Sequence, residues 1–167
     1  METYKMIEGF ENYSVSDHGN VKNNKTGRIK TVKPNIKGYI HISMQINKIE
    51  HNKLMHVIVA SAFIPNPENK PFVDHIDNNR SNNSVNNLRW ATLVQNNQNK
   101  ELYKNSKSGV KGVFFDKHAK KYRAQITIDG IQIHLGLFAN IEDAKQVRIK
   151  KANEAFGIFT HSSEKII

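Results

Sequence analysis

An aspartate and a histidine stand side by side at the end of a short apolar run, and an asparagine-rich stretch follows them. The segment VDHIDNNRSNNSVNNLRW, residues 73–90, begins like one strand and ends like the start of another. TLVQ, residues 92–95, then has the pattern of a helix capping box, so we expect a helix that carries Asn96 in its first turns. The predicted order of strand, loop, strand and helix constrains the fold more than any other part of the chain.

The residue types in this segment suit the hydrolysis of a phosphodiester. That reaction needs a nucleophilic water, a leaving 3′ oxygen relieved of its charge and a neutralised phosphate. A hard cation such as magnesium takes oxygen ligands, for which a carboxylate such as Asp74 and an amide such as Asn96 are suited. His75 could take the proton from water. Adjacent strand residues face opposite ways, so the pair can serve both needs only where the strand ends or is distorted.

The chain resembles the HNH family of nucleases, whose ββα-metal motif has this order. The resemblance covers HVIVASAFIPNP, VDHIDNNRSNNSVNNLRWAT and LVQNN. It implies that His75 is the general base and that Asn87 ties the loop together and orients the histidine. It also implies that Asp74 and Asn96 hold the metal, Mg²⁺ or Mn²⁺.

Two assignments in this motif stay open. Neighbouring asparagines could shift the closing position away from Asn96; they are Asn86, Asn97 and Asn99. Arg89 either contacts a DNA phosphate or is a strand-surface arginine.

The part before the motif, residues 1–50, is rich in strand formers and turn signals. In GYIHISMQI, Ile42 and Met44 alternate with polar residues, which predicts a half-buried strand. Six cations make this expected β platform basic: Lys22, Lys25, Arg28, Lys30, Lys33 and Lys37. YKMIEGFENYSVSDHGNVKN resembles the modular motif that often precedes HNH domains.

The segment between this platform and the motif, NKLMHVIVASAF, predicts a helix with Asn52 as its cap and Pro65 beyond its end.

Residues 105–160 read as a separate part of the chain. SGVKGVFFDKHAKKYRAQITIDGIQIHLGLF predicts three strands, with Asp129-Gly130 as a hairpin turn. A helix from about Ile141 is expected to be capped by Asn140, to end at Gly157 and to pack through alanines and a valine: Ala144, Val147, Ala152 and Ala155. The other sheet face is expected to be polar, basic and poor in aromatic residues.

This C-terminal segment resembles the Apetala-type DNA-binding domain, over GVKGVFF, KKYRAQI, HLGLFANIEDAKQ and KANEAFG. The resemblance implies that the sheet, not the helix, lies in the major groove. The residues expected to contact DNA are Lys111, Arg123, Gln125, Thr127 and His134. Lys111, Thr127 and His134 replace side chains that are usual in that family.

Charge and composition agree with a DNA partner. The formal net charge is +10, which favours a polyanion. The chain has no cysteine, which excludes disulfides and thiolate zinc sites.

The N-terminus does not read as a signal peptide, no stretch approaches the roughly 20 apolar residues of a membrane span, and no nucleotide-binding loop is present. We expect an intracellular, cytoplasmic protein, in the host cell if the gene is viral.

The fold class predicted is α+β, a small modular protein. It would contain a β platform at 1–50, a ββα-metal nuclease core at 51–102 and a three-stranded antiparallel sheet plus helix at 105–160. The predicted function is a homing-type endonuclease that acts as a monomer on an asymmetric site in double-stranded DNA. The alternative is a non-catalytic DNA-binding regulator built from the same parts. An RNA-binding protein would need exposed aromatic residues for base stacking, of which the sheet face offers few.

Overall fold

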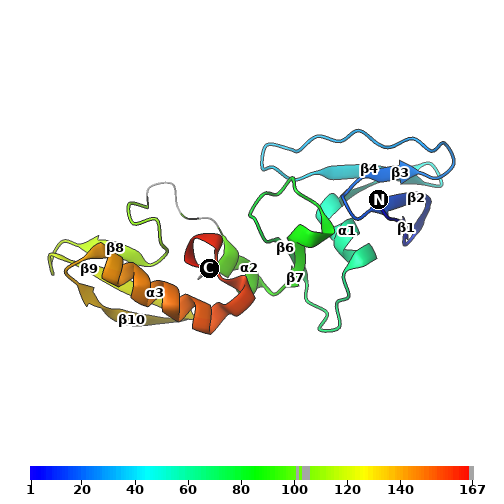
Figure 1. The fold of residues 1–167 in the computed structure, drawn as a ribbon. Helices are drawn as coiled ribbons and strands as arrows, with labels where there is room; N and C mark the ends of the chain where they lie inside the picture. The colour runs from blue at the N-terminus through cyan, green and yellow to red at the C-terminus, as the bar shows by residue number, and fades with distance from the viewer. Residues whose placement is uncertain (101, 103–105, 166–167) are drawn as a thin grey trace. The chain divides into compact units, whose positions relative to one another are not determined.

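The computed structural model describes residues 1–100, 102 and 106–165, and the chain forms two compact units, Met1–Leu93 and Val94–Ile167. Both units mix strands and helices (Figure 1), which confirms the α+β class. The domain start that we predict at residue 105 lies outside the described residues. No helix in the described ranges is long and apolar enough to cross a membrane.

The first unit begins with two small antiparallel sheets. Strands β1 (Tyr4–Ile7), β2 (Phe10–Ser16) and β3 (Val21–Asn23) form one sheet, and β4 (His41–Ile46) and β5 (Ile49–Leu54) form the other. Ile42 and Met44 are buried in β4, as their alternation predicts. The β platform expected at the N-terminus is therefore present.

The predicted start of the first helix is wrong. Helix α1 runs over Met55–Phe63, and Asn52, the expected cap, lies inside β5. Asn47 and Lys48 both have positive φ angles, 50° and 67°, and they join Ile46 to Ile49 in a two-residue hairpin turn. This turn folds 49–54 back onto β4, so the ladder extends to Leu54 before the helix can begin.

The predicted strand pair follows α1. Strands β6 (Phe72–His75) and β7 (Leu88–Ala91) pair antiparallel, and the short 3-10 helix η1 (Val85–Asn87) leads into β7. Helix α1 packs against both strands, and Val59 lies in the same buried cluster as Val73 and Leu88. Trp90 Nε1 donates a hydrogen bond to the carbonyl of Ile64 (2.9 Å), just beyond the helix. The strand pair is thus fixed on the core of the first unit.

Helix α2 (Leu93–Asn99) follows β7, as the capping pattern predicts, and the rest of the second unit is a sheet covered by a helix. Strands β8 (Val113–Asp116), β9 (Lys121–Ile128) and β10 (Ile131–Phe138) form an antiparallel sheet in the order β10-β9-β8. Helix α3 (Ile141–Phe156) lies along one face of it (Figure 1). Two 3-10 helices, η2 (Gly157–Phe159) and η3 (Ser162–Glu164), end the described chain.

The predicted ends of α3 are confirmed, but its packing face differs from the prediction. The Asn140 side chain accepts a hydrogen bond from Glu142 N (2.9 Å), and Gly157 terminates the helix with a φ of 51°. Val147 and Ala155 are exposed, contrary to the prediction. The buried side chains are those of Ala144, Arg148 and Ala152. Arg148 is buried because its guanidinium pairs with Glu164 (3.2 Å), a residue far along the sequence.

The open face of this sheet is more apolar than predicted. A β-bulge between His134 and Gly136 shifts the alternation of β10, so that Leu137 lies opposite Arg123. Phe114 of β8 pairs with Arg123 from the other side and is 44% exposed. The face therefore offers one aromatic and one aliphatic side chain among its polar groups.

Candidate functional site

Asp74 and Arg89 lie opposite each other in the β6–β7 ladder. Arg89 donates to one carboxylate oxygen of Asp74 through Nε (2.8 Å) and Nη2 (2.6 Å). The exposed fractions of the two side chains are only 5% and 13%. Arg89 is therefore not a freely exposed strand-surface arginine, because its guanidinium compensates a buried carboxylate.

His75 is the last residue of β6 and pairs with Leu88, so it faces the opposite side of the strand pair from Asp74. Its Nε2 lies 3.2 Å from Asn83 Oδ1, and Asn83 Nδ2 donates to the carbonyl of Ser81 (3.2 Å). Because an amide oxygen can only accept, Nε2 carries the proton and Nδ1 is the basic atom of the neutral ring. Burial lowers the pKa of His75, which favours this neutral form.

Two further aromatic rings enclose His75. The His56 ring of α1 lies 5.0 Å from it between centroids, and the Tyr39 ring lies 6.3 Å away. Burial, followed by the neighbouring His75, lowers the pKa of His56 to about 4. His56 is therefore neutral at pH 7, and its Nδ1 has no hydrogen-bond partner among the described residues. The surroundings of His75 thus disfavour a positive charge.

Asn87 connects three parts of the asparagine-rich loop. Its amide nitrogen donates to Asp77 Oδ1 (2.8 Å) and to the carbonyl of Asn82 (2.9 Å), and its amide oxygen accepts from Asp77 N (3.0 Å). Its backbone carbonyl also accepts from Ile76 N (2.9 Å), directly after the Asp-His pair. Asn87 thus holds the loop closed next to His75, which is the geometry needed for the predicted loop brace. Asn83, which contacts the imidazole itself, was not singled out from the sequence.

Asn96 lies in α2, half-buried, and belongs to the second unit. The structure thus places Asn96 on α2, as predicted. Its role as a metal ligand stays a prediction. A buried carboxylate and an amide oxygen are donors that suit a hard divalent cation. Asp74 and Asn96 accordingly fit the chemistry of such an ion.

Four of the predicted DNA contacts lie on β9 and β10. Arg123 donates to Asp116 Oδ2 through Nε (3.0 Å) and Nη2 (2.5 Å), which holds the guanidinium against the sheet. Gln125 pairs with His134 across the ladder, and Thr127 follows on the same face. Lys111 lies outside the sheet, and its Nζ donates to the carbonyl of Gln98 in α2 (2.7 Å). The structure thus places four of these five residues in the sheet, and Lys111 lines one pocket together with Gln125 and Thr127.

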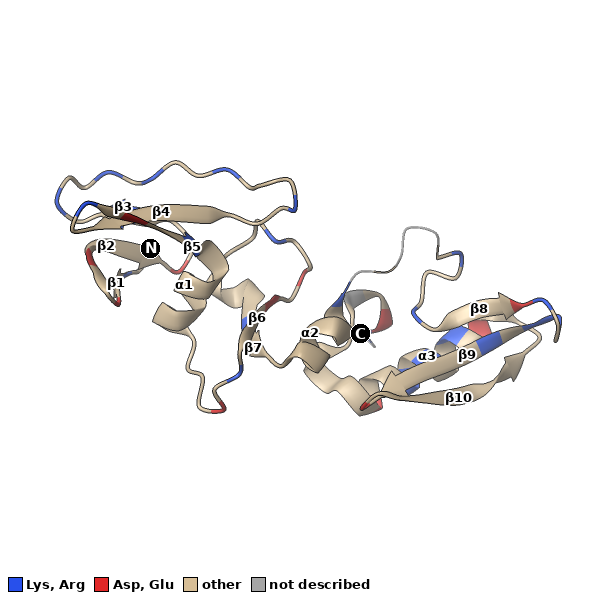
Figure 2. Ribbon diagram, turned by 180° about the vertical axis from the view of Figure 1, so that it is seen from behind, with Lys and Arg blue, Asp and Glu red and all other residues tan. Residues whose placement is uncertain are grey.

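Two groups of lysines and arginines lie in connections between strands. Figure 2 shows Lys and Arg along the segment between β3 and β4 and again around the turn that joins β8 to β9. The second group includes three exposed residues, Lys117, Lys120 and Lys121.

Comparison with known families identifies two of the parts. Residues 53–98 match the HNH endonuclease family, and residues 2–45 match the NUMOD4 motif. The chain therefore contains an HNH endonuclease domain preceded by a NUMOD4 motif. HNH nucleases in general depend on a divalent metal. The Apetala-type assignment of the C-terminal part stays a prediction.

Individual relatives come from viruses and phages. The chain is 36% identical over 90 residues to an uncharacterized HNH endonuclease, L245, of Acanthamoeba polyphaga mimivirus, covering 54% of this chain and 27% of that protein. It is 37% identical over 99 residues to the DNA endonuclease I-HmuI of Bacillus phage SP01, covering 58% of this chain and 56% of that protein. The chain thus spans about a quarter of the first relative and just over half of the second.

A solved structure of the HNH homing endonuclease I-HmuI, described as showing DNA binding and cleavage, has a similar fold. The TM-score is 0.56 at 24% sequence identity, and the match covers 93% of this chain and 92% of that one. This likeness concerns the fold.

Proposed function

We propose that the protein is a homing-type endonuclease that hydrolyses phosphodiester bonds in double-stranded DNA with Mg²⁺ or Mn²⁺. The observation that carries the proposal is the environment of two adjacent residues. Asp74 and His75 are adjacent and buried at the end of β6, and they face opposite sides of the strand pair. Arg89 compensates the charge of Asp74, and burial lowers the pKa of His75, which favours its neutral form. The match to the HNH endonuclease family supports this function. The viral and phage relatives support the host-cell cytoplasm as the location of the protein.

His75 acts as the general base in this proposal. Its Nε2 proton is committed to Asn83, so the lone pair of Nδ1 accepts a proton from the attacking water. A base that is neutral at pH 7 can do this without first losing a proton. Asn87 keeps the loop closed, so that His75 stays in place during the reaction.

Asp74 and Asn96 would hold the metal ion through their side-chain oxygens. A bound divalent cation neutralises charge on the phosphate and the leaving 3′ oxygen. Arg89 holds the Asp74 carboxylate in place when no metal is present, because it is hydrogen bonded to one of the carboxylate oxygens.

The second unit supplies much of the sequence-selective affinity, and the protein acts as a monomer on an asymmetric site. The open face of the β8–β10 sheet presents Gln125, Thr127 and His134 as hydrogen-bonding side chains. Phe114 and Leu137 add apolar groups of the kind that contact thymine methyls. Exposed lysines at the β8–β9 turn can reach phosphates.

A DNA-cleavage assay tests the proposal. The protein is incubated with a library of supercoiled plasmids in Mg²⁺, in Mn²⁺ and in excess chelator. Metal-dependent nicking or linearisation at a defined sequence is the expected result. A protein that binds one sequence tightly but cuts nothing in either metal would instead be the non-catalytic DNA-binding regulator.

A further inference from the structure

The turn between β2 and β3, Ser16–Asn20, is held rigidly by hydrogen bonds. Ser16 N donates to the carbonyl of Asn20 (2.8 Å), and Gly19 N donates to the carbonyl of Ser16 (3.0 Å). Ser16 Oγ accepts from the backbone nitrogens of Asn20 (2.9 Å) and His18 (3.3 Å). Ser16 is itself fully buried. The turn has little freedom to move.

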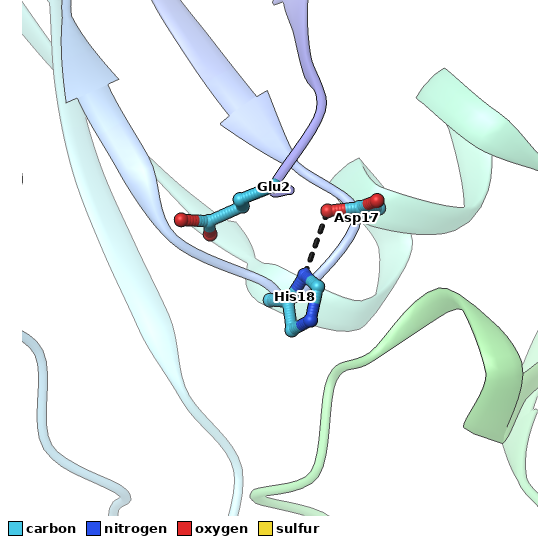
Figure 3. A group of neighbouring side chains, drawn as sticks. All are labelled: Glu2, Asp17 and His18. Atoms are coloured by element: carbon cyan, nitrogen blue, oxygen red, sulfur yellow. Dashed lines mark hydrogen bonds and ion pairs between the residues drawn. The ribbon is translucent and has the colours of Figure 1, made fainter.

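The chain's N-terminal residues fasten the same turn from outside. Glu2, Asp17 and His18 lie with their ligand atoms within 4.8 Å of one another, and Figure 3 shows the hydrogen bond between Asp17 and His18 (2.7 Å). Asp17 Oδ1 also accepts from Thr3 N (3.1 Å), and Glu2 accepts from the Asn20 side chain (2.7 Å). The cluster of Glu2, Asp17 and His18 is therefore explained by a structural role, in which these hydrogen bonds hold the turn in place.

The turn presses against the asparagine-rich loop at Gly19. A Cβ on Gly19 would lie 2.9 Å from Asn83 Cβ, which is closer than packed atoms allow, and 3.2 Å from the Asn83 carbonyl oxygen, which is a tight contact. Gly19 also has a φ of 82°, so both the space and the backbone require glycine. A second contact joins the same parts, because Val85 N donates to the carbonyl of Asp17 (2.8 Å).

Asn83 passes this contact on to His75. Asn83 is 4% exposed, and its amide oxygen is the atom that faces His75 Nε2. A shift of the Asn83 backbone would therefore move the acceptor that sets the tautomer and the tilt of the imidazole. Partners of this kind orient a reactive histidine without touching the substrate.

We propose that the Ser16–Asn20 turn is a positioning element of the catalytic site, in which Gly19 holds Asn83 where it fixes the His75 ring. The NUMOD4 segment then contributes to DNA cleavage indirectly, by positioning the general base His75. Asn83 and Gly19 are positioning residues in this scheme. The inference rests on the proposed nuclease function only for its effect on cleavage.

Substitutions in the full-length protein test the scheme by single-turnover cleavage at saturating DNA. Gly19→Ala and Asn83→Ala should each slow cleavage by about 10- to 100-fold with little change in DNA affinity. Gly9→Ala is the matched control, because Gly9 has a similar φ of 72° but nothing within 4 Å of an added Cβ. It should cut at nearly the wild-type rate. The double variant of Gly19 and Asn83 should be no slower than Asn83→Ala alone, since Gly19 acts through Asn83.

The nitrogen NMR signals of the His75 ring, at one fixed pH, give a readout that does not depend on cleavage. The wild type and Gly9→Ala should show the tautomer protonated at Nε2, whereas Gly19→Ala and Asn83→Ala should lose that signature. Unchanged His75 signals in Gly19→Ala, or multiplied rate losses in the double variant, would overturn the scheme. If the wild type cuts no DNA, the nuclease proposal fails, and the NMR comparison alone still decides this one.

Discussion

The Arg89 guanidinium and the Asp74 carboxylate form an ion pair across β6 and β7, with Nη2 2.6 Å from Oδ2. Their cross-strand register places a cation on the one carboxylate that the sequence marks as a metal ligand. Removing one partner of a buried pair leaves an uncompensated charge, which costs more than a surface pair does. The pair therefore links the stability of the strand pair to the chemistry of the site.

Arg89→Met should lower the free energy of unfolding of the metal-free protein by about 3 kcal/mol, because Asp74 is left buried without its cation. Arg28→Met is the control in the same unit, since Arg28 is exposed and should cost under about 1 kcal/mol. Urea unfolding measures both. Added Mg²⁺ should stabilise Arg89→Met more than the wild type, because the ion restores positive charge at Asp74. Equal stabilities of Arg89→Met and the wild type would show that the pair contributes nothing.

Stability should fall in acid through His56. Its pKa is 6.5 in the unfolded chain and about 4 in the folded protein, because burial disfavours the charged ring. The folded state thus binds fewer protons, so this contribution is complete above pH 6.5 and is lost as the pH falls toward 4. The loss amounts to about 3 kcal/mol. His56→Phe, a ring that does not titrate, should flatten the dependence over this range. Identical pH profiles for the two proteins would refute the assignment to His56.

Lys121 and Gln125 should affect DNA binding in different ways. Lys121→Ala should reduce the salt dependence of log affinity by about 0.9 if the lysine reaches a phosphate. Gln125→Ala should relax preference at one or two base pairs, by roughly 1–3 kcal/mol each, with the salt slope unchanged. Lys150→Ala on α3 is the control for charge alone. Binding titrations across salt concentrations and sequence variants separate the effects, and a Lys150→Ala slope as shallow as that of Lys121→Ala would contradict this DNA-facing surface.

A deletion of the C-terminal part is a weaker test than these substitutions. Helix α2, which carries Asn96, belongs to the second unit, and Lys111 bonds to its Gln98 carbonyl. Truncation after residue 104 would therefore remove contacts of the helix that closes the HNH motif. Loss of cleavage by such a protein would not distinguish a defect in DNA recognition from a defect in catalysis.

The order of elements around Asp74 and His75 could be predicted from the sequence, because capping residues and apolar runs are local signals. The contacts that complete the site could not. Six asparagines lie between residues 76 and 87, and only the loop's path shows that the Asn83 amide contacts the His75 ring. The pairing of Arg89 with Asp74 across the two strands likewise depends on how the loop closes, and the number of residues between them does not determine it. Strand β5 was missed because Asn47-Lys48 is a hairpin turn without glycine.

Asp74→Asn should lose activity through the metal while keeping a group that Arg89 can hydrogen bond. Carboxylate ligands are few around a hard cation that keeps much of its water, so the main defect is weaker metal binding. Raising Mg²⁺ or Mn²⁺ should therefore restore part of the cleavage by Asp74→Asn, and less of that by His75→Ala. A metal titration in which the two variants respond alike would mean that their roles are not distinct.

The most direct test of the proposed chemistry is single-turnover cleavage by His75→Ala, measured beside a gel-shift titration on the same DNA. A positioned general base contributes roughly 10²- to 10⁴-fold to a rate, and His75 is too buried to contribute much to DNA affinity. The expected result is cleavage slowed by that factor with binding nearly unchanged. Cleavage at nearly the wild-type rate would remove His75 from the mechanism and contradict the proposed site.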